Sequence, residues 1–154
     1  MPVLRVGLIS DTHGLLRPEA LRALRGCAFI LHAGDVGSAE ILGELGRLAT
    51  VFAVRGNVDR DVLASRLRKA ETVEIGGMLW HVRHDLEGLD LDPVAAGIRV
   101  VVTGHTHRPA VEARGGILYV NPGSAGPGRH GLPVSLALAE VDGGVVAARV
   151  FKLA

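Results

Sequence analysis

The chain has 154 residues, of which 48% are hydrophobic and 3% aromatic, and its formal net charge is +1. The length predicts a single domain over residues 1–154, and the apolar content excludes a disordered chain. Because the basic residues form no cluster, binding of long nucleic acid is not expected.

Cys27 is the only cysteine, which excludes an intramolecular disulfide, and it is expected to be a small buried hydrophobic residue. The first residues look like a strand rather than a secretory signal. No apolar run reaches the roughly 18 residues that a membrane span needs. We therefore expect a cytoplasmic protein that does not bind membranes.

The first half of the chain predicts strands alternating with helices. Runs rich in β-branched residues that stop at polar residues or glycine predict buried strands at 3–10, 27–35 and 50–57. Helical spacing of apolar residues, with Pro18 and Ser38 at helix starts, predicts helices at 18–26, 38–49 and 60–69. This alternation predicts parallel strands.

The second half predicts mainly hairpins. Gly-Gly pairs within alternating apolar patterns indicate tight turns, which gives hairpins at 71–84, 110–121 and 133–153. A short helix is predicted at 91–98 and a strand at 99–105. Because hairpin strands are antiparallel, the whole chain predicts an α/β domain with mixed sheets flanked by helices.

Short polar segments occur at five places where a predicted strand gives way to a loop. They are 10–14, 32–37, 55–59, 83–85 and 104–109. Ligands of open α/β sheets bind at this carboxyl edge. Glycines, which permit tight turns and close approach, recur beside the polar residues.

Two of these segments carry polar residues two positions apart, Asp11 with His13 and His105 with His107. In an extended backbone such residues point the same way, so each pair is expected to aim at one point. Along 78–84, alternation places His84 on the face of the apolar residues and His81 on the other face.

Asp35 and Asn57 add oxygen donors to this set. The seven candidate ligands are Asp11, His13, Asp35, Asn57, His84, His105 and His107. They are too many for one first-row metal with open positions. They suit two metals that share a bridging carboxylate, an arrangement that promotes displacement at phosphorus.

The ordered blocks D-x-H, G-D, G-N-x-D, a lone His and G-H-x-H resemble the calcineurin-like metallophosphoesterase superfamily. GNVD and VNPGS (120–124) look like its small bacterial and archaeal phosphodiesterase branch, which is similar to the retromer subunit Vps29. The resemblance spans nearly the whole chain. It implies a four-layer α-β-β-α sandwich with two mixed sheets, and a metal-dependent phosphodiesterase.

The resemblance also implies roles for individual residues. Asp11, His13 and His107 would hold a first metal. Asn57, His84 and His105 would hold a second, and Asp35 would bridge the two. A hydroxide between the metals would attack phosphorus, and Asp35, Asn57 and His105 are assigned to catalysis. Mn²⁺ is favoured, although Fe, Zn²⁺, Co²⁺ and Ni²⁺ also suit mixed nitrogen and oxygen ligands.

Two positions depart from the family pattern. Many members have a histidine that helps the leaving group where this chain has Val58, which cannot transfer a proton. The block that usually reads His-Gly is His84-Asp85 here. Arg55 and Arg129 are candidates to contact substrate phosphate.

Other polar residues are assigned to structure. His32 is expected to be buried and hydrogen-bonded, with support of the metal site as the alternative. Asp59 would stabilise a turn or orient a neighbour, and His130 would lie on the surface.

Three interpretations of function stay open. The first is a phosphodiesterase that acts on a small substrate, and the second, within the same class, is a phosphomonoesterase. The third is a Vps29-like interaction scaffold with a vestigial metal site, although this chain retains every ligand that animal Vps29 subunits have partly lost. The sequence names no physiological substrate, and a homo-oligomer is left open.

Overall fold

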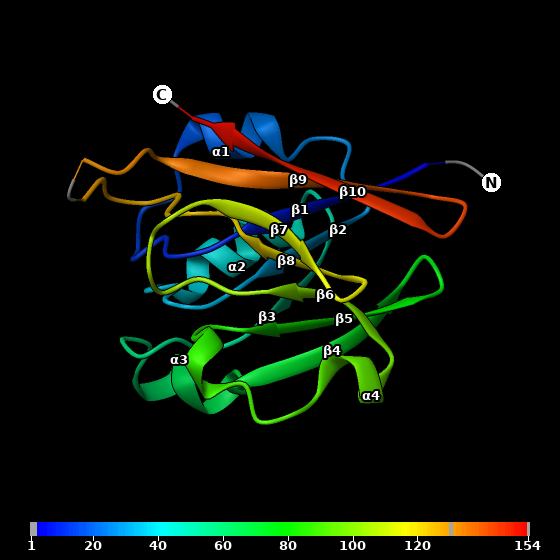
Figure 1. Ribbon diagram of the computed structural model, residues 1–154. Coiled ribbons are helices and arrows are strands. Elements are labelled where there is room, and N and C mark those ends of the chain that lie inside the picture. The colour runs from blue at the N-terminus through cyan, green and yellow to red at the C-terminus, as the bar shows by residue number, and fades with distance from the viewer. Residues whose placement is uncertain (1–2, 130, 154) are drawn as a thin grey trace.

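The computed structural model describes residues 3–129 and 131–153, which form two mixed five-stranded sheets (Figure 1). The first sheet has the order β10-β9-β1-β2-β3. Its strands are β1 (Leu4–Ile9), β2 (Phe29–His32), β3 (Thr50–Ala53), β9 (Ser135–Asp142) and β10 (Val145–Lys152). The second sheet has the order β4-β5-β6-β8-β7. Its strands are β4 (Ala70–Ile75), β5 (Met78–Arg83), β6 (Ile98–Val102), β7 (Ala110–Arg114) and β8 (Ile117–Asn121).

The pairing of the strands agrees with the pattern of the sequence. In the first sheet β1, β2 and β3 pair in parallel, as strand–helix alternation predicts, and the β9–β10 hairpin pairs antiparallel. In the second sheet β5, β6 and β8 are parallel, while the hairpin partners β4 and β7 run antiparallel to them. The predicted α/β class with two mixed sheets is confirmed.

The main hydrophobic core lies between the two sheets. Val6 and Leu8 of β1 face Trp80 and Val82 of β5 across this layer, and all four are fully buried. Alternation along β5 puts His81 on the opposite face, where its Nδ1 lies 2.8 Å from Oγ1 of Thr72. The period of two thus directs the apolar residues of β5 inward, as the sequence predicts.

Helices cover the outer face of the first sheet. They are α1 (Pro18–Ala23), α2 (Ala39–Gly46) and α3 (Asp61–Arg66), and each contributes to a second apolar cluster on that face. Ser38 caps α2, because its Oγ accepts a hydrogen bond from the backbone N–H of Glu40 (3.2 Å).

The outer layer on the second sheet is slight. It consists of the 3-10 helix η1 (Leu86–Gly88) and of α4 (Pro93–Ala96), which contacts β6. These layers match the predicted four-layer sandwich. Within the described residues, every helix is too short or too polar to cross a bilayer.

Candidate metal centre

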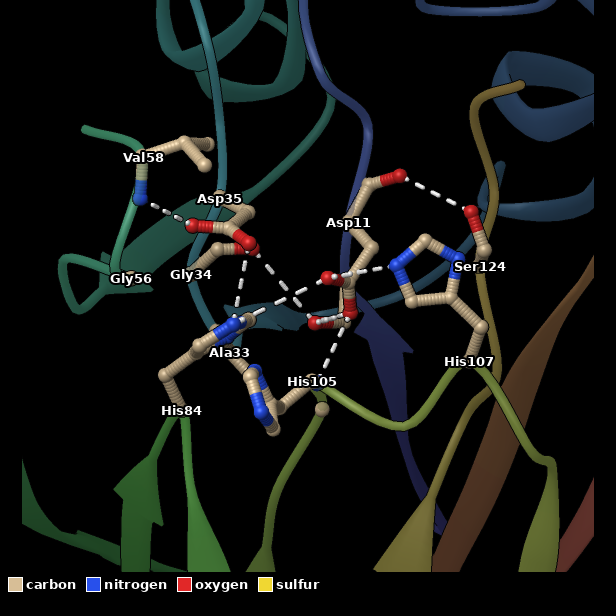
Figure 2. Close-up of polar contacts among 12 residues, drawn as sticks. Asp11, Ala33, Gly34, Asp35, Gly56, Val58, His84, His105, His107 and Ser124 are labelled. Atoms are coloured by element: carbon tan, nitrogen blue, oxygen red, sulfur yellow. Dashed lines mark hydrogen bonds and ion pairs between the residues drawn. The ribbon is translucent and has the colours of Figure 1, made fainter. Parts of the chain in front are cut away.

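Two buried carboxylates form the middle of the site, one after β1 and the other after β2 (Figure 2). Oδ2 of Asp11 accepts hydrogen bonds from the hydroxyl of Ser10 (2.7 Å) and the backbone N–H of His105 (3.1 Å). Oδ1 of Asp35 accepts one from the backbone N–H of Val58 (2.9 Å). Each carboxylate is therefore anchored through one oxygen, and its other oxygen faces the centre.

Three imidazole nitrogens converge on these free oxygens. The distances from Oδ1 of Asp11 to Nε2 are 3.5 Å for His13, 3.8 Å for His84 and 3.2 Å for His107. Oδ2 of Asp35 lies 3.0 Å from Nε2 of His84 and 3.7 Å from Nε2 of His13. Residues that are distant in the sequence thus present their polar atoms to one small volume.

Several of these atoms lack a hydrogen-bond partner among the described residues, although they are buried. They include Oδ1 of Asp11 and Nε2 of both His13 and His84. His84 approaches Asp35 closely, but the geometry is not that of a hydrogen bond. Buried polar atoms are almost always paired, so a convergent set without partners in the protein has the character of a ligand-binding site.

The same atoms have the chemistry of a metal site. One group consists of Asp11, His13 and His107, and a second consists of Asp11, Asp35 and His84. Within each group the ligand atoms lie within 4.8 Å of one another. Imidazole nitrogens and carboxylate oxygens are the ligands of Mn, Fe, Zn and related ions, so the donor set fits divalent cations.

His84 is oriented for this purpose. Its Nδ1 lies 2.7 Å from the carbonyl oxygen of Ala33 and donates a hydrogen bond to it, which leaves Nε2 of the neutral ring as a free ligand atom. Burial lowers the pKa of His84, but its contact with Asp35 and the charge of Asp11 outweigh that effect and raise the pKa. Burial raises the pKa of the Asp35 carboxyl, but the contact with His84 and the hydrogen bond from the N–H of Val58 outweigh that effect and lower the pKa.

Asn57 and His105 lie to one side of this centre. Both are exposed, and together with His84 they line a cavity of about 250 Å³. The ring centroids of His84 and His105 are 5.2 Å apart. The structure therefore brings Asn57 and His105 to the same cavity as His84, and His105 belongs to neither of the two tight groups of histidines and carboxylates.

The backbone at the site differs from the extended geometry that the spacing of the pairs predicts. Asp11, His13, His105 and His107 have φ between 46° and 73°, in the left-handed region, and so does Asp35 with φ 55°. The expectation that an extended segment aligns each pair is therefore wrong. Such strained conformations cost about 1–3 kcal/mol each and persist where the surroundings enforce them.

Asp59 is the clearest structural support of the site. Its carboxylate accepts hydrogen bonds from the backbone N–H groups of Val36 (3.2 Å), Gly37 (2.9 Å) and Gly56 (2.9 Å). It thereby ties the loop of Asp35 to the loop of Asn57. The sequence left two hypotheses for Asp59, that it stabilises a turn or that it orients a neighbour. The residue joins two loops, so its role extends beyond a single turn.

Three residues that sequence reasoning passed over or left as a turn also hold the ligand loops. Ser10 anchors Asp11, and the hydroxyl of Ser124 donates to the carbonyl oxygen of Asp11 (3.0 Å). The amide of Asn121 donates to the carbonyl oxygen of Gly104 (3.0 Å), beside the two histidines. The only signal for Ser10 was its position at the polar end of a strand.

His32 is buried and hydrogen-bonded, as expected. Its Nδ1 accepts a hydrogen bond from the backbone N–H of Gly34 (3.1 Å), so Nε2 carries the proton and donates to Oγ1 of Thr12 (3.0 Å). The Thr12 hydroxyl in turn donates to the carbonyl oxygen of Val36 (2.8 Å). Burial lowers the pKa of His32 to about 4.

The candidate phosphate-binding arginines occupy different places. Arg55 lines the cavity of Asn57 and His84, and its Nη1 donates to the carbonyl oxygen of Ala64 (3.0 Å). Arg129 is exposed. Burial lowers the pKa of His107, and the charge of Arg129 is among those that lower it further. His130 lies outside the described residues.

Comparison with known proteins agrees with this geometry. Residues 4–144 match the model of the calcineurin-like phosphoesterase superfamily domain. A probable metallophosphoesterase of Methanothermobacter thermautotrophicus is 36% identical over 96% of this chain and 91% of its own. The phosphodiesterase YfcE of Escherichia coli is 29% identical over 91% of this chain and 89% of its own.

The fold also matches a Vps29 protein. Vps29 of Entamoeba histolytica, solved in complex with zinc, superposes with a TM-score of 0.76 at 23% identity, covering 98% of this chain and 100% of that one. This likeness concerns the fold. From its family match and its 36% identical relative, the chain belongs to the calcineurin-like phosphoesterase superfamily.

Proposed function

We propose that the protein is a phosphodiesterase that works with two divalent metal ions held by the seven predicted ligands. The observation that carries the proposal is the convergence of unpaired Nε2 and carboxylate oxygen atoms on Asp11 and Asp35. The names of the relatives, a metallophosphoesterase and a phosphodiesterase, support it. Mn²⁺ is the proposed ion, and Fe, Zn²⁺, Co²⁺ and Ni²⁺ also suit the ligands.

When bound, the cations would supply a water molecule of lowered pKa as the nucleophile and would neutralise charge on the phosphate. The chain contributes the geometry. The N–H of Val58 fixes one oxygen of Asp35, and Ala33 fixes the ring of His84. Asn57 and His105 line the adjoining cavity, where an ester oxygen would be bound and oriented.

The nature of the leaving group follows from the side chain at position 58. Valine offers no proton, so a leaving alkoxide would receive none from this residue. We therefore propose small phosphodiesters with good leaving groups as the favoured substrates. A cytoplasmic location is a further prediction from the sequence, whereas the oligomeric state stays open.

The test is hydrolysis of bis(p-nitrophenyl) phosphate with added Mn²⁺, followed by elemental analysis of the purified protein. Asp35→Asn and His105→Ala are expected to lose most of the activity, whereas His81→Ala, on the far face of β5, serves as the matched histidine control. Full activity in both Asp35→Asn and His105→Ala would overturn the proposal.

The second candidate is an interaction scaffold, and the similarity to Vps29 favours it. Because that Vps29 structure contains zinc, metal binding alone does not separate the two functions. Turnover above a metal-free control excludes a purely structural role. The ratio of rates on a phosphodiester and on the matching phosphomonoester decides between diesterase and monoesterase.

A further inference from the structure

The cavity beside His84 carries a marked excess of positive charge. Besides three of the predicted metal ligands, Arg55, Lys69 and Arg83 line it. The one carboxylate among its described lining residues is Asp85, whose Oδ1 accepts a hydrogen bond from the backbone N–H of Glu87 (3.0 Å). The cavity thus presents three cations against one anion that already has a partner.

The arginines are held in place without losing their charge. Nε of Arg83 donates to the carbonyl oxygen of Asp85 (2.7 Å), and its guanidinium packs against Gly88, where a Cβ atom would stand 3.1 Å from Cζ. Arg55 donates to the carbonyl oxygen of Ala64. Within residues 3–129 and 131–153, no ion pair forms between a carboxylate and any of the three basic side chains.

The position of the cavity separates this charge from the carboxylate centre. Asn57, His84 and His105 border it, whereas Asp11 and Asp35 are not among its described lining residues. A phosphodiester carries a single negative charge, which two divalent cations already exceed. Three additional cations instead suit a phosphomonoester group, which is close to dianionic and accepts several charge-assisted hydrogen bonds.

A larger cavity of about 460 Å³ shares Asp85 and His105 with the basic cavity but differs in charge. Its acidic and basic side chains are nearly balanced, and Nε of Arg114 lies 3.7 Å from Oε1 of Glu112. Pockets that hold a whole small ligand measure roughly 300–1,000 Å³, so the basic cavity of about 250 Å³ suits one group of a substrate.

We propose that the cavity lined by Arg55, Lys69 and Arg83 binds a second phosphate group of the substrate. The preferred substrate is then a phosphodiester that also carries a phosphomonoester group near the scissile bond. This inference rests on the proposed phosphodiesterase function and deepens it by naming the class of substrate.

The test compares two esters that differ only in the second phosphate. They are thymidine 5′-(p-nitrophenyl phosphate) and the same compound with a 3′-phosphate. A single charge-assisted hydrogen bond predicts a kcat/KM about tenfold higher for the ester with the 3′-phosphate. The preference should reside mainly in KM and weaken as salt is added.

Lys69 gives the cleanest variant, because its side chain is exposed and its removal should not disturb folding. Lys69→Ala is expected to reduce the tenfold ratio by several-fold, and Lys69→Glu to abolish it. Arg83→Ala is likewise expected to reduce the ratio by several-fold. The matched control is Arg68→Ala, which removes the neighbouring exposed cation that pairs with Glu71, and it should keep the ratio.

Equilibrium binding separates this inference from the proposed function. Calorimetry with thymidine 3′,5′-bisphosphate and thymidine 5′-phosphate, on metal-loaded and on chelator-treated protein, needs no turnover. Tighter binding of the bisphosphate that Lys69→Glu eliminates supports the cavity even if neither ester is hydrolysed. Equal binding of both nucleotides, or a kinetic ratio that Lys69→Glu leaves unchanged, overturns the inference whether or not the protein is a phosphodiesterase.

Discussion

Gly56 lies directly against the carboxylate of Asp35, and a Cβ atom at position 56 would stand 2.7 Å from Cγ of Asp35. The backbone nitrogen of Asp35 lies on the same side, so a side chain there would force one of the two loops to move. Oδ2 of this carboxylate faces His84 at 3.0 Å. The absence of a side chain at position 56 therefore helps to set the position of one of the two central carboxylates.

Gly56→Ala is expected to displace Asp35 and weaken metal binding. Forcing a methyl group into this contact should also cost about 1–3 kcal/mol of the free energy of unfolding. The matched control is Gly43→Ala on α2, where a Cβ atom meets nothing within 4 Å and helix propensity predicts a gain of about 0.5–1 kcal/mol. Denaturant unfolding and metal titration calorimetry measure both effects. Unaltered metal affinity in Gly56→Ala would contradict the assignment.

His81 lies within β5 and His84 directly after it, and replacing each histidine should affect metal binding differently. His84→Ala removes an inward-facing Nε2, so metal affinity should fall by at least about tenfold. His81→Ala removes a buried ring on the other face, so it should lower the melting temperature without changing metal content. Added Mn²⁺ should then raise the melting temperature of wild type and His81→Ala by more than that of His84→Ala. The same metal-induced shift in both variants would argue against His84 as a ligand.

The hairpins and the parallel pairing of β1, β2 and β3 follow from local patterns of the sequence. Gly-Gly pairs at 76–77 and 115–116 fix two hairpins, and alternation along β5 fixes which histidine faces inward. These features are predictable because they depend on neighbours in the chain. The predicted ligands also follow strand ends, where parallel strands bring their loops to one edge.

The backbone conformation of the site could not be predicted from local patterns. The left-handed residue Asp11 is held by tertiary contacts, namely the hydrogen bonds that it accepts from the hydroxyl of Ser124 and from the backbone N–H of His105. No local pattern encodes these contacts, so the spacing of the pairs predicted an extended segment. Likewise the bonds of Asp59 join loops that are separate in the sequence, and its role becomes visible only in three dimensions.

Stability should depend on pH through His32. Protonation at Nδ1 would place an N–H against the N–H of Gly34, and burial lowers the pKa to about 4 from an unfolded value of 6.5. The unfolded chain therefore binds the proton first, so this stabilisation is complete above pH 6.5 and is lost as pH falls toward 4. It amounts to about 3 kcal/mol.

Urea unfolding of wild type and His32→Gln between pH 4 and 7 measures this contribution. Because other histidines titrate in both proteins, the difference between the two curves isolates His32. The difference in unfolding free energy should shrink as pH falls through this window. Parallel curves would mean that His32 titrates alike in the folded and unfolded chain.

Val58 offers a gain-of-function prediction. Its backbone N–H donates to Asp35, whereas its side chain is 41% exposed, so the side chain can change without loss of that bond. Many members of the superfamily have, at this position, a histidine that assists the leaving group. Val58→His is therefore expected to accelerate hydrolysis of diesters with alkyl leaving groups, by about tenfold or more if the imidazole acts as a general acid.

The pH dependence and the leaving group together identify the cause of such a gain. Only the protonated imidazole donates, so the gain should decline as pH rises above about 6.5. A p-nitrophenolate leaving group needs little proton assistance, so the rate on bis(p-nitrophenyl) phosphate should change little. Val58→Gln provides a polar control without an acid of suitable pKa. An equal gain for Val58→Gln would mean that polarity at position 58, rather than proton transfer, assists the leaving group.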